Sequence, residues 1–105
     1  MKPFNLDSDK FLEYLKVNFD SILLDVRTDE EYESARIPGS ILIDYYQSDF
    51  FDKIRNLDKS ISYFVYCRSG RRSLEACYMM YEFGFNDVYN LKNGILGWKG
   101  EIVRG

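Results

Sequence analysis

Histidine is absent from the 105-residue chain, and cysteine and proline each occur only twice. Without an imidazole the chain cannot build a Cys-His dyad, a Ser-His-Asp triad, a histidine-ligated metal site or a histidine general base. Two cysteines in a chain of this length do not make a disulfide framework. Any cysteine chemistry in this protein must therefore proceed without a histidine partner.

Long hydrophobic runs are also missing. No apolar run approaches the roughly 18 residues that a membrane-spanning helix needs. The N-terminal stretch MKPFNLDSDKFLEYL carries acidic residues where a signal peptide has its hydrophobic segment. The net charge of -3 is opposite in sign to the basic surface typical of nucleic-acid binding. We therefore expect a cytoplasmic protein whose partners include neither a membrane nor a nucleic acid, although a chain that had lost a leader peptide would look the same.

The residues that are present are typical of a globular domain. Hydrophobic residues make up 46% of the chain and charged residues 30%, which separates it from disordered chains. Aromatic residues reach 17%, so we expect a core built partly from large rings. The length is near the common domain size, and no repeat or linker divides it. The sequence predicts one domain over residues 1–105.

Strand and helix patterns alternate along the chain. Short apolar runs predict buried strands at SILLDV, ILI, SISYFVY and DVYNL. Helices are predicted between them: one capped by Asp7 or Ser8, one from the Thr28–Glu31 capping box to about Ala35, one over QSDFFDKIRNL, one over SLEACYMMYEF stopped by Gly84, and a short one at NGILGW. The predicted inner faces hold Leu6, Phe11, Leu12 and Leu15 in the first helix and Phe50, Phe51, Ile54 and Leu57 in the third.

This alternation predicts an α/β fold with a mainly parallel central sheet flanked by helices. In such sheets ligands bind at the carboxyl ends of strands, beside helix N-termini. Cys67 lies at that kind of strand end, in FVYCRSGRRSLEACYMM.

Three arginines, Arg68, Arg71 and Arg72, follow Cys67 within five residues. We expect the segment from Arg68 to Arg72 to turn from strand to helix, with Gly70 supplying backbone freedom and the helix beginning at Ser73. Free N–H groups, the helix dipole and the arginines all favour a thiolate over a thiol. The same groups would hold an oxyanion. The motif predicts an anion cradle with a nucleophile at its base.

The segments LLDVRTDEEYESARIPGSI, VYCRSGRRS and GFNDVYNLKNGILGW together resemble a single-domain rhodanese, a sulfurtransferase, over about Leu23 to Trp98. The resemblance implies a rhodanese-like domain in which Cys67 takes sulfane sulfur from a donor, usually thiosulfate, and carries it as a persulfide to a thiophilic acceptor. It assigns Cys67 as the catalytic residue and no metal or cofactor. The substrate-binding cradle that it implies comprises Arg68, Ser69, Gly70, Arg71 and Arg72, with Ser73 opening the next helix.

Two positions depart from the family pattern. Arg36 precedes IPG where the family often has histidine, and Asn93 precedes Gly94 where it often has a second glycine. Neither is the nucleophile, and asparagine tolerates left-handed backbone conformations. The departure at Arg36 therefore does not put the chemistry in doubt, and the turn at Asn93 should survive.

Other functions remain open beside sulfur transfer. Cysteine phosphatases and arsenate reductases also use a cysteine-arginine loop, but theirs has five residues between the two, which here would place the arginine at Ser73. A sulfur-relay or binding module is the third reading. The donor is expected to be a small anion, and the acceptor could be cyanide, glutathione, another thiol or a protein.

Three further residues have structural explanations. Arg27 is expected to pair with Glu30 or Glu31 and brace the loop after the first predicted strand, and Asp25 is not expected to be catalytic. Cys77 lies beside Ala76 in the predicted helix, which favours a packed core residue over a partner for Cys67.

Overall fold

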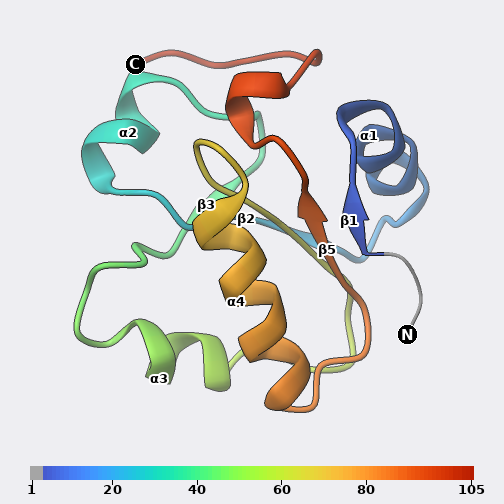
Figure 1. Ribbon diagram of the computed structural model, residues 1–105, viewed down its shortest axis with the longest axis vertical. Helices are drawn as coiled ribbons and strands as arrows, with labels where there is room; N and C mark the ends of the chain where they lie inside the picture. The colour runs from blue at the N-terminus through green and yellow to red at the C-terminus, as the bar shows by residue number, and fades with distance from the viewer. Residues whose placement is uncertain (1–3) are drawn as a thin grey trace.

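Five short parallel strands form the centre of the fold in the computed structural model, which describes residues 4–105. Their order across the sheet is β1-β5-β4-β2-β3 (Figure 1). The predicted α/β class with a parallel sheet is confirmed. The strands are β1 (Asn5–Leu6), β2 (Ile22–Asp25), β3 (Ile41–Leu42), β4 (Tyr63–Tyr66) and β5 (Val88–Leu91).

The helices begin largely where the sequence places their caps. Asp7 caps the first helix by accepting from Lys10 N, and Thr28 and Glu31 form the predicted capping box of the second. No helix in residues 4–105 is long and apolar enough to cross a membrane. The helices are α1 (Ser8–Val17), α2 (Asp29–Ser34), α3 (Phe50–Arg55), α4 (Arg71–Glu82) and the 3₁₀ turn η1 (Ile95–Gly97).

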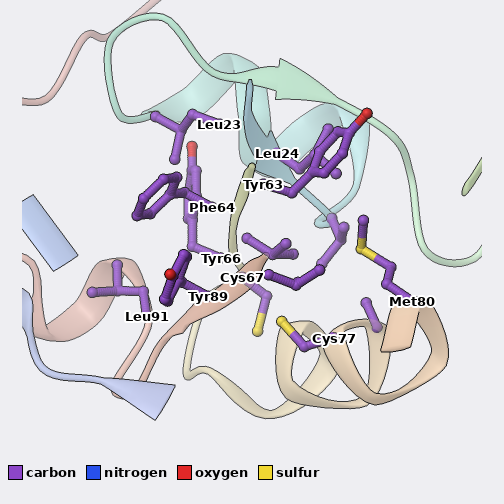
Figure 2. Close-up of a cluster of buried hydrophobic side chains, with 14 of the residues drawn as sticks. Leu23, Leu24, Tyr63, Phe64, Tyr66, Cys67, Cys77, Met80, Tyr89 and Leu91 are labelled. Carbon is purple, nitrogen blue, oxygen red and sulfur yellow. The ribbon is translucent and has the colours of Figure 1, made fainter. Parts of the chain in front are cut away.

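Side chains of β4 alternate between two covered faces of the sheet. Phe64 meets Phe11 of α1, with ring centroids 5.4 Å apart, and stacks on Tyr89 of β5 at 4.9 Å. Cys67, three residues later, points to the opposite face, because strand side chains alternate. Figure 1 shows α4 crossing that face, and Figure 2 shows Cys67 beside Cys77 of this helix. The sequence therefore places Cys67 between the sheet and α4.

Three sequence predictions about the elements are wrong. Leu6 lies in β1, paired with Leu91, and not on the face of the first helix. Phe51 is 55% exposed, although Phe50 and Ile54 are buried as predicted. The helix after the cysteine begins at Arg71 rather than Ser73, with Gly70 as its N-cap in the left-handed region at φ 92°.

Candidate functional site

Cys67 is the first residue after β4, at the carboxyl edge of the sheet, and residues 67–70 form the Cys67 loop that leads into α4. Its side chain is fully buried, with 0% exposed surface. The loop is short because α4 starts at Arg71. The first turn of the helix therefore lies directly against the cysteine sulfur.

Three protein donors meet the Cys67 sulfur. Gly70 N lies 3.2 Å from Sγ, and Ser73 N and Ser73 Oγ each lie 3.4 Å from it. Burial alone raises the pKa of Cys67. Hydrogen bonds from the Ser73 hydroxyl and from the amides of Ser73, Gly70 and Ser69 outweigh it, so the pKa lies below the ordinary thiol value. The site thus stabilises a thiolate without a histidine.

The loop backbone is fixed from the side of η1. Ile95 N donates to the Cys67 carbonyl at 2.9 Å, and Leu96 N donates to the Arg68 carbonyl at 3.2 Å. A Cβ at Gly94 would collide with the Arg68 carbonyl, and one at Gly70 would collide with the Lys92 carbonyl. Both positions therefore require glycine, because the loop and the segment after β5 touch through their backbones.

The three arginines of the motif have different surroundings. Arg68 and Arg71 are exposed, and within residues 4–105 neither forms an ion pair. Arg72 is held by both oxygens of Glu31, each 3.2 Å from a guanidinium nitrogen, and lies over the Tyr46 ring at 5.5 Å. Two arginines are thus free to meet an anion, while the third is anchored to α2.

The expected pairing of Arg27 with Glu30 or Glu31 is wrong. Arg27 Nη2 contacts Asp25 Oδ2 at 2.7 Å and donates to the Ala35 carbonyl at 2.6 Å. Asp25 is 0% and Arg27 is 4% exposed, so the pair is buried. Glu31 is engaged by Arg72 instead. Arg27 nevertheless braces the turn after β2, as predicted, because its bonds to Asp25 and to the Ala35 carbonyl tie that turn to the end of α2.

Cys77 is a buried core residue, as the sequence predicts. Figure 2 shows its sulfur facing that of Cys67 across the gap between β4 and α4. Burial raises the pKa of the Cys77 thiol, and the neighbouring Cys67 adds to the effect. Cys77 is therefore held as a neutral thiol, in contrast to Cys67.

The sequence motif did not include two residues that contact this site. Glu31 was singled out as a helix cap, and its bond to Arg72 spans 41 positions, so no local spacing reveals it. Asn90 donates to the Gly70 carbonyl at 3.2 Å. Its signal was a polar residue inside the apolar run DVYNL. In the described part of the chain, no group of three His, Cys, Asp or Glu side chains is placed to hold a metal.

Comparisons with known proteins agree with this geometry. The chain is 30% identical to a sulfurtransferase of Allochromatium vinosum over 89% of this chain and 85% of that protein. It is 33% identical to the thiosulfate sulfurtransferase GlpE of Pseudomonas syringae, over 75% and 73% of the two chains. The crystal structure of a rhodanese-like domain protein from Staphylococcus aureus superposes with a TM-score of 0.81 at 25% identity, covering 97% of this chain and 98% of that one.

The family comparison covers the whole site. Residues 8–101 match the rhodanese-like domain, a stretch that includes the sheet strands from β2 to β5, the Cys67 loop and η1. Because this match spans most of the chain and the fold agrees, the chain belongs to the rhodanese-like domain family.

Proposed function

We propose that this chain is a sulfurtransferase that carries sulfane sulfur as a persulfide on Cys67. The observation that carries the proposal is the Cys67 sulfur, which accepts from Gly70 N, Ser73 N and Ser73 Oγ at 3.2–3.4 Å. These donors favour the thiolate, which is the nucleophilic form of cysteine. The named activities of the similar proteins support the same reaction class.

Thiosulfate is the donor that we propose. The Cys67 thiolate attacks the outer sulfur of thiosulfate, a Cys67 S–S bond forms, and the S–S bond of thiosulfate breaks. Sulfite leaves with the electron pair of that bond, so no oxidant or reductant is consumed. Charge shifts from the thiolate to the departing sulfite, and donors fixed around both positions would stabilise that shift. A relative that is named for thiosulfate supports this choice.

The arginines and the backbone amides of the cradle have different roles in this proposal. Arg68 and Arg71, exposed and without ion pairs among residues 4–105, would bind the sulfonate end of the donor. The amides of Ser69, Gly70 and Ser73 face the reacting sulfur. Arg72 is anchored by Glu31 and would add positive charge near Cys67 without leaving its place.

The second half of the reaction returns the thiolate. A thiophilic acceptor attacks the outer sulfur of the persulfide, the new bond forms to the acceptor, and Cys67 leaves as thiolate. Cyanide would give thiocyanate, and a small thiol or a protein thiol would give a new persulfide. The cradle that stabilises the thiolate at the start also makes Cys67 a better leaving group here.

Intact mass spectrometry tests the proposal. After thiosulfate, we expect the wild-type protein to gain the mass of one sulfur atom and to lose it on addition of cyanide. Cys67→Ser should gain nothing, because no other thiol is activated. Cys77→Ser is the matched control and should gain the sulfur, because Cys77 is buried and its pKa is raised.

A sulfur gain in Cys67→Ser, or its loss in Cys77→Ser, would contradict the assignment of Cys67. Hydrolysis of an aryl phosphate by the wild type, with no persulfide formed from thiosulfate, would instead favour the phosphatase reading of the same loop.

A further inference from the structure

Asn90 is a polar side chain in the middle of an apolar strand. It lies in β5 with 0% exposed surface, between Asn5 of β1 and Val65 of β4. Its Nδ2 donates twice, to Asn5 Oδ1 at 2.9 Å and to the Gly70 carbonyl at 3.2 Å. The second bond crosses from the sheet to the N-cap of α4, within the Cys67 loop.

The other end of the same amide is left unpaired. Asn90 Oδ1 is buried and has no hydrogen-bond donor within residues 4–105. The Gly70 carbonyl fixes the amide orientation, because a backbone carbonyl only accepts and a flipped Asn90 amide would place oxygen against oxygen there. A buried acceptor without a partner destabilises a fold, and such exceptions call for an explanation. An apolar side chain in β5 would avoid this cost.

The bond from Asn90 acts at Gly70, whose backbone position sets where the Gly70 and Ser73 donors lie relative to the Cys67 sulfur. Gly70 donates its own N–H to Sγ, and as the N-cap of α4 it precedes the helical turn that carries Ser73. Within residues 4–105, the Gly70 carbonyl otherwise accepts only the first helical bond, from Leu74 N at 3.1 Å. Asn90 is the one side chain in the described range that ties this carbonyl to the sheet.

We propose that Asn90 is a positioning residue for sulfur transfer, holding the N-terminus of α4 against the sheet so that the Gly70 and Ser73 donors meet the Cys67 sulfur. The expected effect of Asn90 on sulfur transfer rests on the proposed function of Cys67. The structural part of the proposal concerns only the donors around the Cys67 sulfur. The unpaired Oδ1 is then the cost of a side chain that must present a donor to Gly70.

The test compares Asn90→Leu with Asn5→Ala, in a Cys77→Ala background that leaves Cys67 as the only thiol. Leucine keeps the branched shape of asparagine and removes the donor. Asn5→Ala removes the other partner of Nδ2 and leaves the Gly70 bond in place. The readout is the rate of Cys67 alkylation by iodoacetamide against pH. The midpoint of that curve reports the pKa of the Cys67 thiol, and the plateau rate reports how accessible the buried sulfur is to the reagent.

The neighbouring charged groups do not shift the midpoint of Cys67 alkylation by titrating in the same pH range. Arg72 of α4 acts electrostatically on Cys67 and stays protonated over the whole pH range. Glu31 of α2, which pairs with Arg72, has its pKa below the ordinary carboxyl value of 4.5 and stays ionised through the titration. Cys77 of α4 also interacts electrostatically with Cys67, and the background substitution removes it.

We expect Asn90→Leu to raise the alkylation midpoint, so that the rate below the midpoint falls about threefold, the effect of weakening one hydrogen bond. Sulfur transfer from thiosulfate to cyanide should fall with it, while Asn5→Ala keeps the wild-type midpoint. The melting temperatures of the two variants should not follow their alkylation midpoints, because Asn90→Leu also removes the unpaired Oδ1. If Asn90→Leu does not fold, Asn90→Ala takes its place.

An unchanged midpoint in the Asn90 variant would overturn the proposal, as would an equal shift in Asn5→Ala. Failure of the proposed function gives a different result, because wild type would then gain no sulfur from thiosulfate while the alkylation midpoints still report on Asn90.

Discussion

At the scale of single residues, hydrogen bonds around Cys67 matter more than the arginines that draw attention in the sequence. The largest contributions that lower its pKa come from the Ser73 hydroxyl and from the amides of Ser73, Gly70 and Ser69. Arg72 interacts with the sulfur, but Glu31 neutralises much of its charge. The sequence predicted an activated cysteine with the helix N-terminus and arginines as causes. The arginine charges are visible in the sequence, whereas only the fold places Ser73 Oγ beside the Cys67 sulfur.

Ser73→Ala tests the leading contribution. Removing the hydroxyl takes one donor from the thiolate and leaves the Ser73 amide in place, so the pKa of Cys67 should rise. A hydrogen bond to a charged group contributes about 1.5–3 kcal/mol in proteins, so we expect a rise of about one pH unit. The midpoint of Cys67 alkylation against pH measures it.

Ser69→Ala is the matched control, because Ser69 acts through its backbone amide, which alanine retains. Equal shifts in the two serine variants, or no shift in Ser73→Ala, would show that the hydroxyl is not the cause.

At the scale of elements, the Glu31–Arg72 pair connects α2 to the start of α4. Glu31 closes the capping box of α2 by accepting from Thr28 N at 3.0 Å, and it also holds Arg72. The capping box was predictable because it is local. The ion pair was not, because its two members come together only when β2 and β4 align in the sheet.

Glu31→Gln should make stability less dependent on pH. Burial alone raises the pKa of Glu31, but bonds from Arg72 and Thr28 outweigh it and hold the pKa below the ordinary 4.5. A lowered folded-state pKa stabilises the protein above pH 4.5, and this contribution is lost as the pH falls through the folded value. The side chains of Arg72 and Glu31 are 19% and 26% exposed, so we expect their ion pair to contribute on the order of 1 kcal/mol to the free energy of unfolding.

Thermal melts from about pH 7 down to about pH 3 measure this linkage. The difference in melting temperature between wild type and Glu31→Gln should be largest at the upper end and shrink towards the lower. Glu30→Gln removes the same charge from α2 without touching Arg72. A constant difference across the range, or the same trend in Glu30→Gln, would argue against the pair.

Most elements were predictable because their signals are local, and the errors have local causes too. β1 has only two residues, too few for any periodicity, so Leu6 was assigned to the helix that follows. Phe50 and Ile54 are four apart and share one face of α3. Phe51 is rotated by about 100° from Phe50 on a helix, so both cannot point inward. Hydrophobicity alone does not distinguish them.

At the scale of the whole molecule, parallel strands bring distant residues to one edge. The carboxyl ends of β4 and β5 lie side by side, and this places the Cys67 loop against η1 and Asn90. The position of the site followed from the sequence, because ligands in parallel α/β sheets bind at this edge. The contacts of Asn90 with Gly70 and of Glu31 with Arg72 did not, because they join residues that are 20 and 41 positions apart.

Charge is distributed unevenly over the same molecule. The chain carries a net charge of -3, yet Arg68 and Arg71 stand exposed and without ion pairs among residues 4–105 at the Cys67 loop. An anionic donor is repelled by the body as a whole and attracted by this local site. At 0.1 M salt, interactions between exposed charges more than about 10 Å apart are largely screened. Added salt weakens both the repulsion and the attraction, and the attraction at short range has the larger effect on donor binding.

We therefore expect the KM for thiosulfate to rise as sodium chloride is added. Arg71→Gln should raise the KM about fivefold at low salt, the effect of one near-surface charge, and should flatten the salt dependence. Lys59→Gln removes an equal charge ahead of β4, at the opposite edge of the sheet, and should leave the KM near the wild-type value. Steady-state transfer from thiosulfate to cyanide at several salt concentrations measures both. Equal effects of the two substitutions would mean that net charge governs donor binding, and a KM indifferent to Arg68→Gln and Arg71→Gln alike would remove these arginines from the donor site.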